Sequence, residues 1–259
     1  HQYDLKTIGI TGSNGKTVVK EWLFQLLQAD FKIVRSPKSY NSQIGVPLSV
    51  WQIWEDHDLG IFEAGISERG EMERSAPVLD CEIGLFTNIG PAHDEGFSST
   101  EAKIEEKVKL FENAESIIYC KNYELIDKAI QQFKGKRIFS WAFEKGHLAK
   151  EADLLITSLE KFAGKTKIQG IFEGKTIAIQ IPFVDTASIE NAIHCWAVML
   201  FLEYENDLIQ KRMMVLEPIA MRLELKEGIH NCVVINDSYN SDLASLTIAL
   251  NFLNQQGKT

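Results

Sequence analysis

Short apolar runs alternate with amphipathic stretches along most of the 259-residue chain. The runs predict buried strands, and apolar residues repeated every three or four positions predict helices. Strands are expected at Thr7–Ile10, Lys32–Arg35, Leu59–Glu63, Ile83–Thr87, Ser116–Cys120 and Arg137–Trp141, and helices at Val18–Leu27, Ile44–Ile53, Thr100–Asn113, Glu124–Phe133 and Ser188–Leu202. This alternation is typical of βα units on a mostly parallel sheet flanked by helices, so the fold class is α/β.

The pattern changes between Leu154 and Ile181, where short alternating runs are punctuated by three glycines. Such runs predict antiparallel hairpins. We expect them to form a small β appendage on the same domain.

A further unit is expected near the end of the chain. A helix around Leu208–Met214 is followed by Leu216–Pro218, which resembles a linker. A strand at Asn231–Ile235 and a helix at Leu243–Leu253 then begin another α/β unit, which the sequence does not complete.

The composition and net charge of the chain argue against some classes of function. With 45% hydrophobic and 24% charged residues, the chain is an ordinary globular protein with a substantial core. Its formal charge of -9 disfavours a surface that neutralises nucleic-acid phosphates or lies on anionic membrane. Any nucleotide must therefore be held by a local site.

The cysteines and apolar stretches indicate a cytoplasmic protein. The four cysteines are far apart and form no C-x-x-C pair, which argues against a zinc knuckle or a disulfide framework. The longest apolar stretch, Ala192–Leu202, is far shorter than the ~20 residues of a membrane span. The start of the chain has no signal-peptide pattern.

The sharpest local signal is Thr11–Thr17, which reads Thr-Gly-Ser-Asn-Gly-Lys-Thr between a predicted strand and a predicted helix. Glycines allow a tight turn whose N–H groups point at phosphate oxygens, and the helix N-terminus adds positive potential. Lys16 would add a full charge, and Thr17 a hydroxyl for Mg²⁺. The spacing departs from G-x-x-x-x-G-K-[ST], and the plain alternative is a glycine turn with a surface lysine.

This segment, with Gly12, Ser13, Asn14, Gly15 and Lys16, resembles the shortened phosphate loop of the Mur ligases and folylpolyglutamate synthases. Four further segments extend the resemblance: Tyr40–Pro47, Phe62–Gly65, Thr87–His93 and Asn236–Asn240. Their order and spacing are most similar to the Mur ligases that add D-alanyl-D-alanine. Met221–Glu224 and Asn236–Asp242 further resemble the form fused to an alanine racemase.

The resemblance implies a domain plan. Mur ligases have an N-terminal domain for the UDP-sugar, a central ATPase domain with a P-loop-type sheet, and a Rossmann-like C-terminal domain. Residues 1–218 would correspond to the central domain and residues 219–259 to the beginning of the third. The UDP-sugar domain would be absent.

The resemblance also implies a reaction in peptidoglycan precursor synthesis. The carboxylate of UDP-N-acetylmuramoyl-tripeptide attacks the γ-phosphate of ATP, and the amine of D-alanyl-D-alanine then attacks the acyl phosphate. ADP and phosphate are released, and Mg²⁺ is expected at two sites. Two alternatives stay open: a folylpolyglutamate synthase-like ligase, and a nucleotide-binding fragment without activity of its own.

Two residues resemble the family's metal ligands. Glu63 ends an apolar strand, where α/β sheets place ligand-contacting groups, and a hard cation prefers such a carboxylate beside the Thr17 hydroxyl. His93 resembles the histidine that binds the second Mg²⁺, and Asn88 would contact the phosphates or the metal shell. Without the motif, Glu63 would be a solvated strand end and His93 an ordinary loop residue.

Lys107 lies in a mixed-charge stretch that would ordinarily be a solvated helix face. Alignment with the family places it at the lysine that CO₂ carbamylates, which would then act on the metal. Lys103 and Lys109 are close enough that a slip in register would change the assignment.

The resemblance also implies which residues contact the adenine, the ribose and the γ-phosphate of the nucleotide. Asn191 resembles the asparagine at the adenine, Arg222 the arginine that reaches the γ-phosphate, and Asp237 the aspartate that holds the ribose. Tyr239 and Asn240 would flank the adenine.

Asn41 and Ser42 have two interpretations. As polar residues before a predicted helix, either could be its N-cap. The resemblance instead places them near the muramoyl-peptide substrate.

Overall fold

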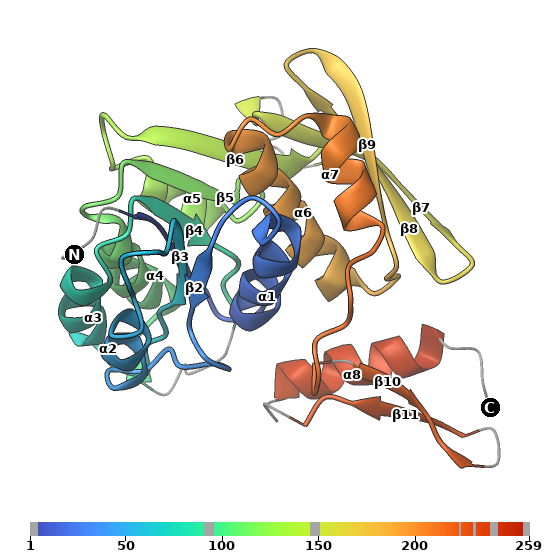
Figure 1. Ribbon diagram of the computed structural model, residues 1–259, viewed down its shortest axis with the longest axis horizontal. Helices are drawn as coiled ribbons and strands as arrows, with labels where there is room; N and C mark the ends of the chain where they lie inside the picture. The colour runs from blue at the N-terminus through green and yellow to red at the C-terminus, as the bar shows by residue number, and fades with distance from the viewer. Residues whose placement is uncertain are drawn as a thin grey trace.

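The computed structural model describes residues 5–90, 96–145, 151–222, 224–229, 232–238 and 243–255. Its main feature is a nine-stranded sheet in the order β2-β3-β1-β4-β5-β6-β7-β8-β9 (Figure 1). The first six strands in this order are parallel. They are β1 (Lys6–Thr11), β2 (Ile33–Arg35), β3 (Leu59–Glu63), β4 (Ile83–Phe86), β5 (Ser116–Cys120) and β6 (Arg137–Phe143). The predicted α/β class is confirmed.

The predicted hairpins are β7 (Leu154–Phe162), β8 (Lys165–Phe172) and β9 (Lys175–Ile181), which pair antiparallel. β7 also pairs parallel with β6, so the hairpins extend the central sheet. Positive φ angles at Gly164 and Gly174 form the two turns, a conformation that glycine adopts at little cost.

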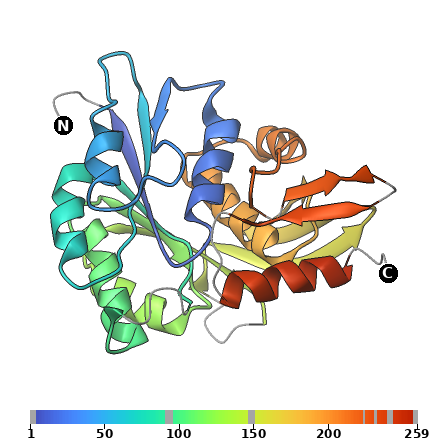
Figure 2. The ribbon, with the colours of Figure 1, turned by 90° about the horizontal axis from the view of Figure 1, so that it is seen from below.

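Helices cover both faces of the sheet (Figure 2). The helices are α1 (Lys16–Leu27), α2 (Gly45–Val50), α3 (Glu71–Leu79), α4 (Thr100–Val108), α5 (Glu124–Ile130), α6 (Thr186–Phe201) and α7 (Asn206–Met213). Neighbouring strand residues point to opposite faces. Ile61 and Leu85 thus join the core under α1 and α6, and Phe62 and Phe86 join the core under α2 to α5.

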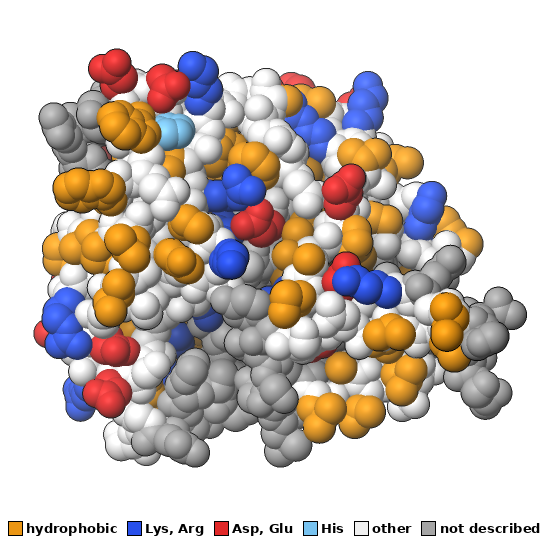
Figure 3. All heavy atoms as spheres, turned by 60° about the horizontal axis from the view of Figure 1, so that its bottom comes forward, with side chains coloured by type: hydrophobic (Ala, Val, Ile, Leu, Met, Phe, Trp, Pro, Cys, Tyr) orange, Lys and Arg blue, Asp and Glu red, His pale blue; other side chains and the backbone are white. Residues whose placement is uncertain are grey.

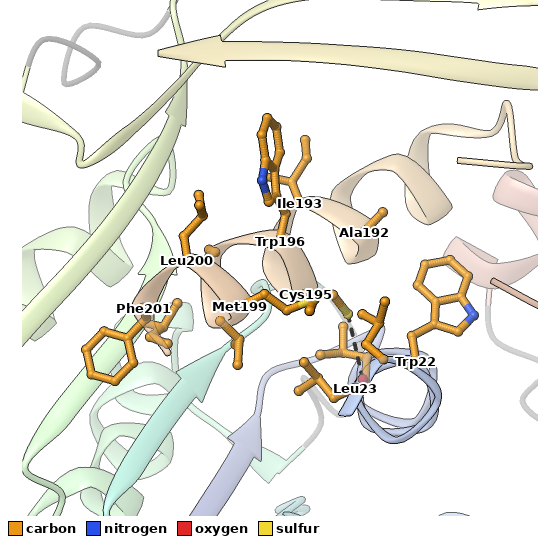
Figure 4. Close-up of a cluster of buried hydrophobic side chains, with 14 of the residues drawn as sticks. Trp22, Leu23, Ala192, Ile193, Cys195, Trp196, Met199, Leu200 and Phe201 are labelled. Atoms are coloured by element: carbon orange, nitrogen blue, oxygen red, sulfur yellow. Dashed lines mark hydrogen bonds between the residues drawn. The ribbon is translucent and has the colours of Figure 1, made fainter. Parts of the chain in front are cut away.

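Helix α6 is buried along most of its length, and nothing polar but Asn191 and His194 lies among its buried residues. Figure 4 shows Cys195 of α6 facing Leu23 and Trp22 of α1, and Cys195 Sγ lies 3.8 Å from the Val19 carbonyl oxygen. Full burial of such side chains stabilises a fold by about 1.5–3 kcal/mol each. This packing fixes α1, and with it the loop before α1, against the sheet.

Some predicted helices end earlier than expected, and one observed helix was not predicted. The helix expected at Ile44–Ile53 is shorter, and the one expected at Thr100–Asn113 ends at Val108 and continues as the 3-10 turn η2 (Lys109–Phe111). α3 was not predicted, because Pro77 lies inside it and proline ordinarily breaks a helix.

The last part of the described chain forms β10 (Glu224–Glu227), β11 (Val233–Asn236) and α8 (Leu243–Gln255). β10 was not predicted. It pairs antiparallel with β11 in a separate two-stranded sheet. The segment between α7 and β10 has no helix or strand among its described residues, as expected of a linker.

Large apolar side chains remain exposed on and after α2, on the side of the molecule where Figure 3 shows hydrophobic side chains gathered. They include Ile44, Leu48, Trp51 and Trp54, and Trp51 is 86% exposed. No helix among the described residues is long and apolar enough to cross a bilayer.

Candidate functional site

Several strand ends meet at the carboxyl edge of the parallel sheet. β1 pairs with β3 on one side and β4 on the other, which sets Ile10 opposite Glu63. The loop Thr11–Gly15 after β1 therefore lies between the ends of these two neighbours. Open α/β sheets bind ligands at this edge.

The loop is held from the end of β4. Asn88 accepts hydrogen bonds from the Ser13 amide at its carbonyl oxygen (2.9 Å) and from the Asn14 amide at Oδ1 (2.9 Å). Thr87 Oγ1 donates to the Asn14 carbonyl oxygen (2.6 Å), and the Gly90 amide donates to Ser13 Oγ (3.0 Å). Two loop amides are thus used within the protein. Those of the first turn of α1 have no partner inside the helix and can bind an anion.

Positive charge converges on this loop. Lys16 Nζ and Lys107 Nζ both donate to the Gly12 carbonyl oxygen, at 2.8 and 3.1 Å. Lys103 Nζ donates to the Gly90 carbonyl oxygen at 2.6 Å. All three side-chain amines come from helices, and a bound polyanion such as a polyphosphate would favour their charged forms.

Burial lowers the pKa of two of these lysines, Lys16 and Lys107. It lowers the pKa of Lys16 to about 8, with Glu63 opposing the shift and Arg222 and Lys103 adding to it. It also lowers the pKa of Lys107 well below its usual value, to which Lys16 and Lys103 contribute. A bound anion would favour the charged forms again, because opposite charges raise a lysine pKa.

Arg222 reaches the site from the far end of the chain. Its Nη2 lies 3.4 Å from Thr17 Oγ1 and 3.3 Å from Ser39 Oγ. The segment after α7 thus brings a guanidinium to the start of α1. Arg222 also makes further interactions within the protein.

Glu63 forms the acidic part of the site. It is completely buried, and its Oε2 accepts hydrogen bonds from Thr17 Oγ1 (3.0 Å) and Asn41 Nδ2 (3.4 Å). Its Oε1 lies 3.0 Å from Lys20 Nζ but accepts no hydrogen bond. Oε2 lies beside the Thr17 hydroxyl, and a carboxylate next to a hydroxyl is a ligand pair that suits a hard divalent cation. The residues present therefore fit Mg²⁺.

Lys20, which sequence reasoning missed, fixes this carboxylate. Its ammonium is fully buried, donates to the Ser36 carbonyl oxygen (2.7 Å), and lies 3.0 Å from Glu21 Oε1 as well as from Glu63. The only signal in the sequence is a lysine on the apolar face of α1.

Asn41 and Ser42, the two residues predicted to lie near the peptide substrate, make different contacts in the structure. Ser42 Oγ accepts a hydrogen bond from the Gly45 amide (3.2 Å), so Ser42 shapes the start of α2 as a cap would. Asn41 points to Glu63 and belongs to the site.

A cavity of about 270 Å³ adjoins the loop. Asn14 and Gly15 of the loop line it together with Asn88, Asn191 and Phe252 of α8, among others. A Cβ at Gly15, where φ is +82°, would overlap Asn191 Oδ1, so the amide of Asn191 packs directly on the loop. The structure thus brings the asparagine predicted to lie at the adenine to a cavity beside the phosphate loop.

His194 is a second residue that sequence reasoning did not single out. Its Nδ1 accepts a hydrogen bond from Trp141 Nε1 (3.1 Å), and its Nε2 lies 2.7 Å from the Thr87 carbonyl oxygen. Burial lowers its pKa to about 3, so the ring is neutral and Nε2 carries the proton. The histidine supports the strand end that holds the loop.

Other sequence candidates are not placed in the cavity. His93, Tyr239 and Asn240 lie outside the described residues. Asp237 follows β11 and does not line the cavity.

Comparison of the sequence with family models gives one match that includes most of the residues of this site. The model for the Mur ligase middle domain matches residues 10–199, which include the loop, Glu63, Lys107 and Asn191. The chain belongs to the Mur ligase family.

Individual Mur ligases are similar to the chain over nearly its whole length. The UDP-N-acetylmuramoyl-tripeptide--D-alanyl-D-alanine ligase of Borreliella burgdorferi is 32% identical over 251 residues, which are 96% of this chain and 52% of that protein. The MurF structure from Acinetobacter baumannii has a TM-score of 0.86 at 22% identity and covers 98% of this chain and 55% of its own. MurF from Thermotoga maritima, solved with ADP, has a TM-score of 0.83 at 19% identity, covering 98% and 58%. The chain spans about half the length of such Mur ligases.

The Mur ligase loop depends on Gly12, which has a φ of +137°. A Cβ there would overlap Thr87 Oγ1 and lie 3.0 Å from the Asn88 carbonyl oxygen. We expect Gly12→Ala to displace the loop and to weaken ATP binding at least about tenfold, since the backbone strain and the clash together cost a few kcal/mol. Gly174→Ala is the matched control, because Gly174 also has a positive φ, of +72°, lies in the turn between β8 and β9, and its Cβ would meet nothing within 4 Å. Equal ATP affinities in titration calorimetry of the two full-length variants would refute this role.

The lowered pKa of buried Lys107 makes the stability of the fold depend on pH. Between its lowered pKa and 10.5, the unfolded chain binds the proton and the folded chain does not, so the cost of burying Lys107 falls as pH rises. In nucleotide-free and CO₂-free buffer, Lys107→Met should exceed the unmutated protein in free energy of unfolding. That excess should shrink by up to about 1.4 kcal/mol per pH unit from pH 8 to 10. Urea unfolding of both proteins measures this difference in free energy of unfolding. The titration of the buried cysteines affects both proteins equally, so it does not contribute to the difference. A difference that does not change with pH would contradict the shifted pKa.

Proposed function

We propose that this chain is the nucleotide-binding part of an ATP-dependent ligase that joins D-alanyl-D-alanine to UDP-N-acetylmuramoyl-tripeptide. The observation that carries the proposal is the loop between β1 and α1, where Lys16, Lys107 and Arg222 converge beside buried Glu63. The names of the similar ligases supply the substrates. They favour this activity over folate polyglutamylation.

The domain plan is part of the proposal. Residues 1–218 would form the central nucleotide-binding domain, and residues 219–259 would begin the C-terminal domain. Two separate sheets, with the boundary between α7 and β10, support this division. A cytoplasmic location is proposed with it, since the substrates are nucleotide-linked precursors and all four cysteines are free thiols.

The phosphates of ATP would lie on the loop and the first turn of α1. Lys16 would exchange its bond to the Gly12 carbonyl oxygen for a phosphate oxygen, and Arg222 would add charge at the γ-phosphate. The backbone of the loop from Gly12 to Gly15 would lie against the phosphates. Asn191 would meet the adenine from the adjoining cavity, with Asp237, Tyr239 and Asn240 completing the nucleoside site from the C-terminal segment.

Thr17 and Glu63 would hold Mg²⁺, and His93 would supply a second metal position. The ion, when bound, would neutralise charge on the phosphate oxygens. Asn41 shares Oε2 of Glu63 and would orient that carboxylate or contact the peptide substrate, with Ser42 shaping the turn behind it.

Lys107 would be carbamylated. Its neutral amine attacks the carbon of CO₂, an N–C bond forms, one C=O bond becomes a carboxylate, and the amine proton leaves to solvent. Burial favours the neutral amine that this step needs. With ¹³C-bicarbonate, the full-length protein should show a carbamate carbon signal that Lys107→Met lacks. Lys103→Met should keep it, and a signal that depends on Lys103 would overturn the assignment.

The chain's residues then act mainly by position and charge. Phosphoryl transfer needs in-line placement and stabilisation of charge on the transferred group more than an acid or a base. The tripeptide carboxylate bonds to the γ-phosphorus as the bond to ADP breaks. The D-alanyl-D-alanine amine then displaces phosphate from the acyl carbon and loses a proton.

The test is ADP release by the full-length enzyme. Release should require both UDP-N-acetylmuramoyl-tripeptide and D-alanyl-D-alanine, and should be absent with a folate and glutamate. The fragment alone should bind ATP weakly and release negligible ADP. ADP release with folate and glutamate, or none with the peptide substrates, would reject the proposed ligase.

A further inference from the structure

The cavity beside the loop contains an acidic residue that has no role in the account above. Glu190 lines it, next in sequence to Asn191 on α6. We propose that Glu190 selects the nucleotide base, by pairing as a carboxylic acid with a base that offers a ring-nitrogen acceptor beside an exocyclic amine donor, as adenine does. This inference rests on the proposed function, since it places a nucleotide on the loop.

The position of the cavity supports a base there. Asn14 and Gly15 belong to both the loop and the cavity lining, so a nucleotide with its phosphates on the loop would extend its nucleoside into this space. The volume of about 270 Å³ is near the lower end of the range of ligand pockets, about 300–1,000 Å³. Ile89, Tyr123 and Phe252 supply apolar and aromatic lining, which suits a flat ring.

The polar lining points to Glu190. Asp185 caps α6 by accepting the Ser188 amide at 2.7 Å, so its side chain is already used. Asn88 holds the loop at Asn14, and Asn191 packs on Gly15. Glu190 accepts hydrogen bonds from Tyr123 Oη, at 2.7 Å, and from the side chain of Asn88. A carboxyl group has about four lone-pair positions, so it can still bind a ligand.

The chemistry of the carboxyl group decides which base fits. A protonated acid offers one O–H donor and one acceptor side by side, which complements N1 and the N6 amine of adenine. An ionised carboxylate only accepts, and complements N1–H and the N2 amine of guanine instead. Burial raises the pKa of Glu190, while hydrogen bonds from Tyr123 and Asn88 oppose the shift. Base preference should therefore depend on pH.

Of the groups that surround Glu190, none is expected to account for a change of charge near neutral pH, which leaves the Glu190 carboxyl group itself. Tyr123 precedes α5, and Cys120 ends β5; burial raises the pKa of both above their usual values, so they are neutral at neutral pH. Asp185, at the start of α6, is fixed as its cap. Asn88, after β4, does not titrate.

The experiment measures ATP, GTP and tripolyphosphate binding to the full-length protein between pH 5.5 and 8.5. Unmutated protein should prefer ATP to GTP by at least about tenfold at low pH, and the preference should fall as pH rises. Glu190→Gln keeps a donor beside an acceptor, so it should retain the preference at every pH. Tyr123→Phe removes a bond that favours the carboxylate, so the preference should persist to higher pH.

Tripolyphosphate lacks a base and serves as the control for folding and for the loop. The variants at positions 190 and 123 should bind it like the unmutated protein. If Glu190→Gln and Glu190→Ala leave the ATP-to-GTP ratio and its pH dependence unchanged, the inference is overturned while the proposed function stands. If unmutated protein binds neither nucleotide nor tripolyphosphate, the proposed function fails first.

Discussion

Replacing Lys16 by alanine in the full-length enzyme is expected to lower kcat by about 10²–10³-fold, the usual effect of removing one preorganised donor from a transition state. Lys16 is the first residue of α1, and its ammonium lies over the loop within hydrogen-bond distance of the Gly12 and Ser13 carbonyl oxygens. No other lysine comes from the loop itself. Lys103 and Lys107 approach from α4 and cannot take its place.

The measurement is ADP release under saturating substrates, with ATP affinity determined in parallel. Lys161→Ala is the matched control, because it removes the same charge from an exposed position on β7. Lys16 also supports the loop through its two hydrogen bonds, so the thermal midpoint of each variant is recorded. Undiminished turnover in a folded Lys16→Ala enzyme would show that the loop does not bind the reacting phosphates.

Replacing Glu63 by glutamine is expected to abolish the dependence of ATP affinity on Mg²⁺ and to lower turnover by a comparable factor. The amide keeps the shape but removes the charge that a divalent cation needs beside Thr17 Oγ1. It also deprives buried Lys20 of one of its two carboxylates. Complete loss of a buried partner costs about 3–5 kcal/mol, and the remaining Glu21 should keep the loss of stability below that.

Glu21→Gln separates the two effects. It removes the other carboxylate at Lys20, also 3.0 Å from the ammonium, whereas the Thr17 hydroxyl donates its hydrogen bond to Glu63. We expect lower stability with unchanged Mg²⁺ dependence. Titration of ATP with and without Mg²⁺ distinguishes the variants, and the same Mg²⁺ response in both would argue against Glu63 as a metal ligand.

The parallel sheet and the tight glycine turn after β1 were predictable because their signals are local. Apolar runs of strand length and the glycine pattern at Gly12 and Gly15 require only neighbours in sequence. The meeting of the loop with Glu63 followed from topology, since carboxyl ends of parallel strands share one edge. The contact between Asn41 and Glu63 was not predicted, because the resemblance placed Asn41 only near the peptide substrate.

Other features depend on packing that periodicity does not encode. Lys20, His194 and Glu190 lie in helices whose pattern predicts only a core face, and their roles follow from partners far away in sequence. α3 and β10 were missed because Pro77 and a run of charged residues outweigh weak apolar spacing. The functional roles of the site residues, His93, Tyr239 and Asn240 included, and the resemblance to a racemase fusion stay predictions.

A crystal structure of the full-length protein with a non-hydrolysable ATP analogue and Mg²⁺ tests the central claim most directly. The account predicts the β- and γ-phosphates on the first turn of α1, with Lys16 Nζ on a phosphate oxygen and the ion beside Thr17 and Glu63. A nucleotide bound elsewhere, with the loop from Gly12 to Gly15 free of phosphate, would contradict it.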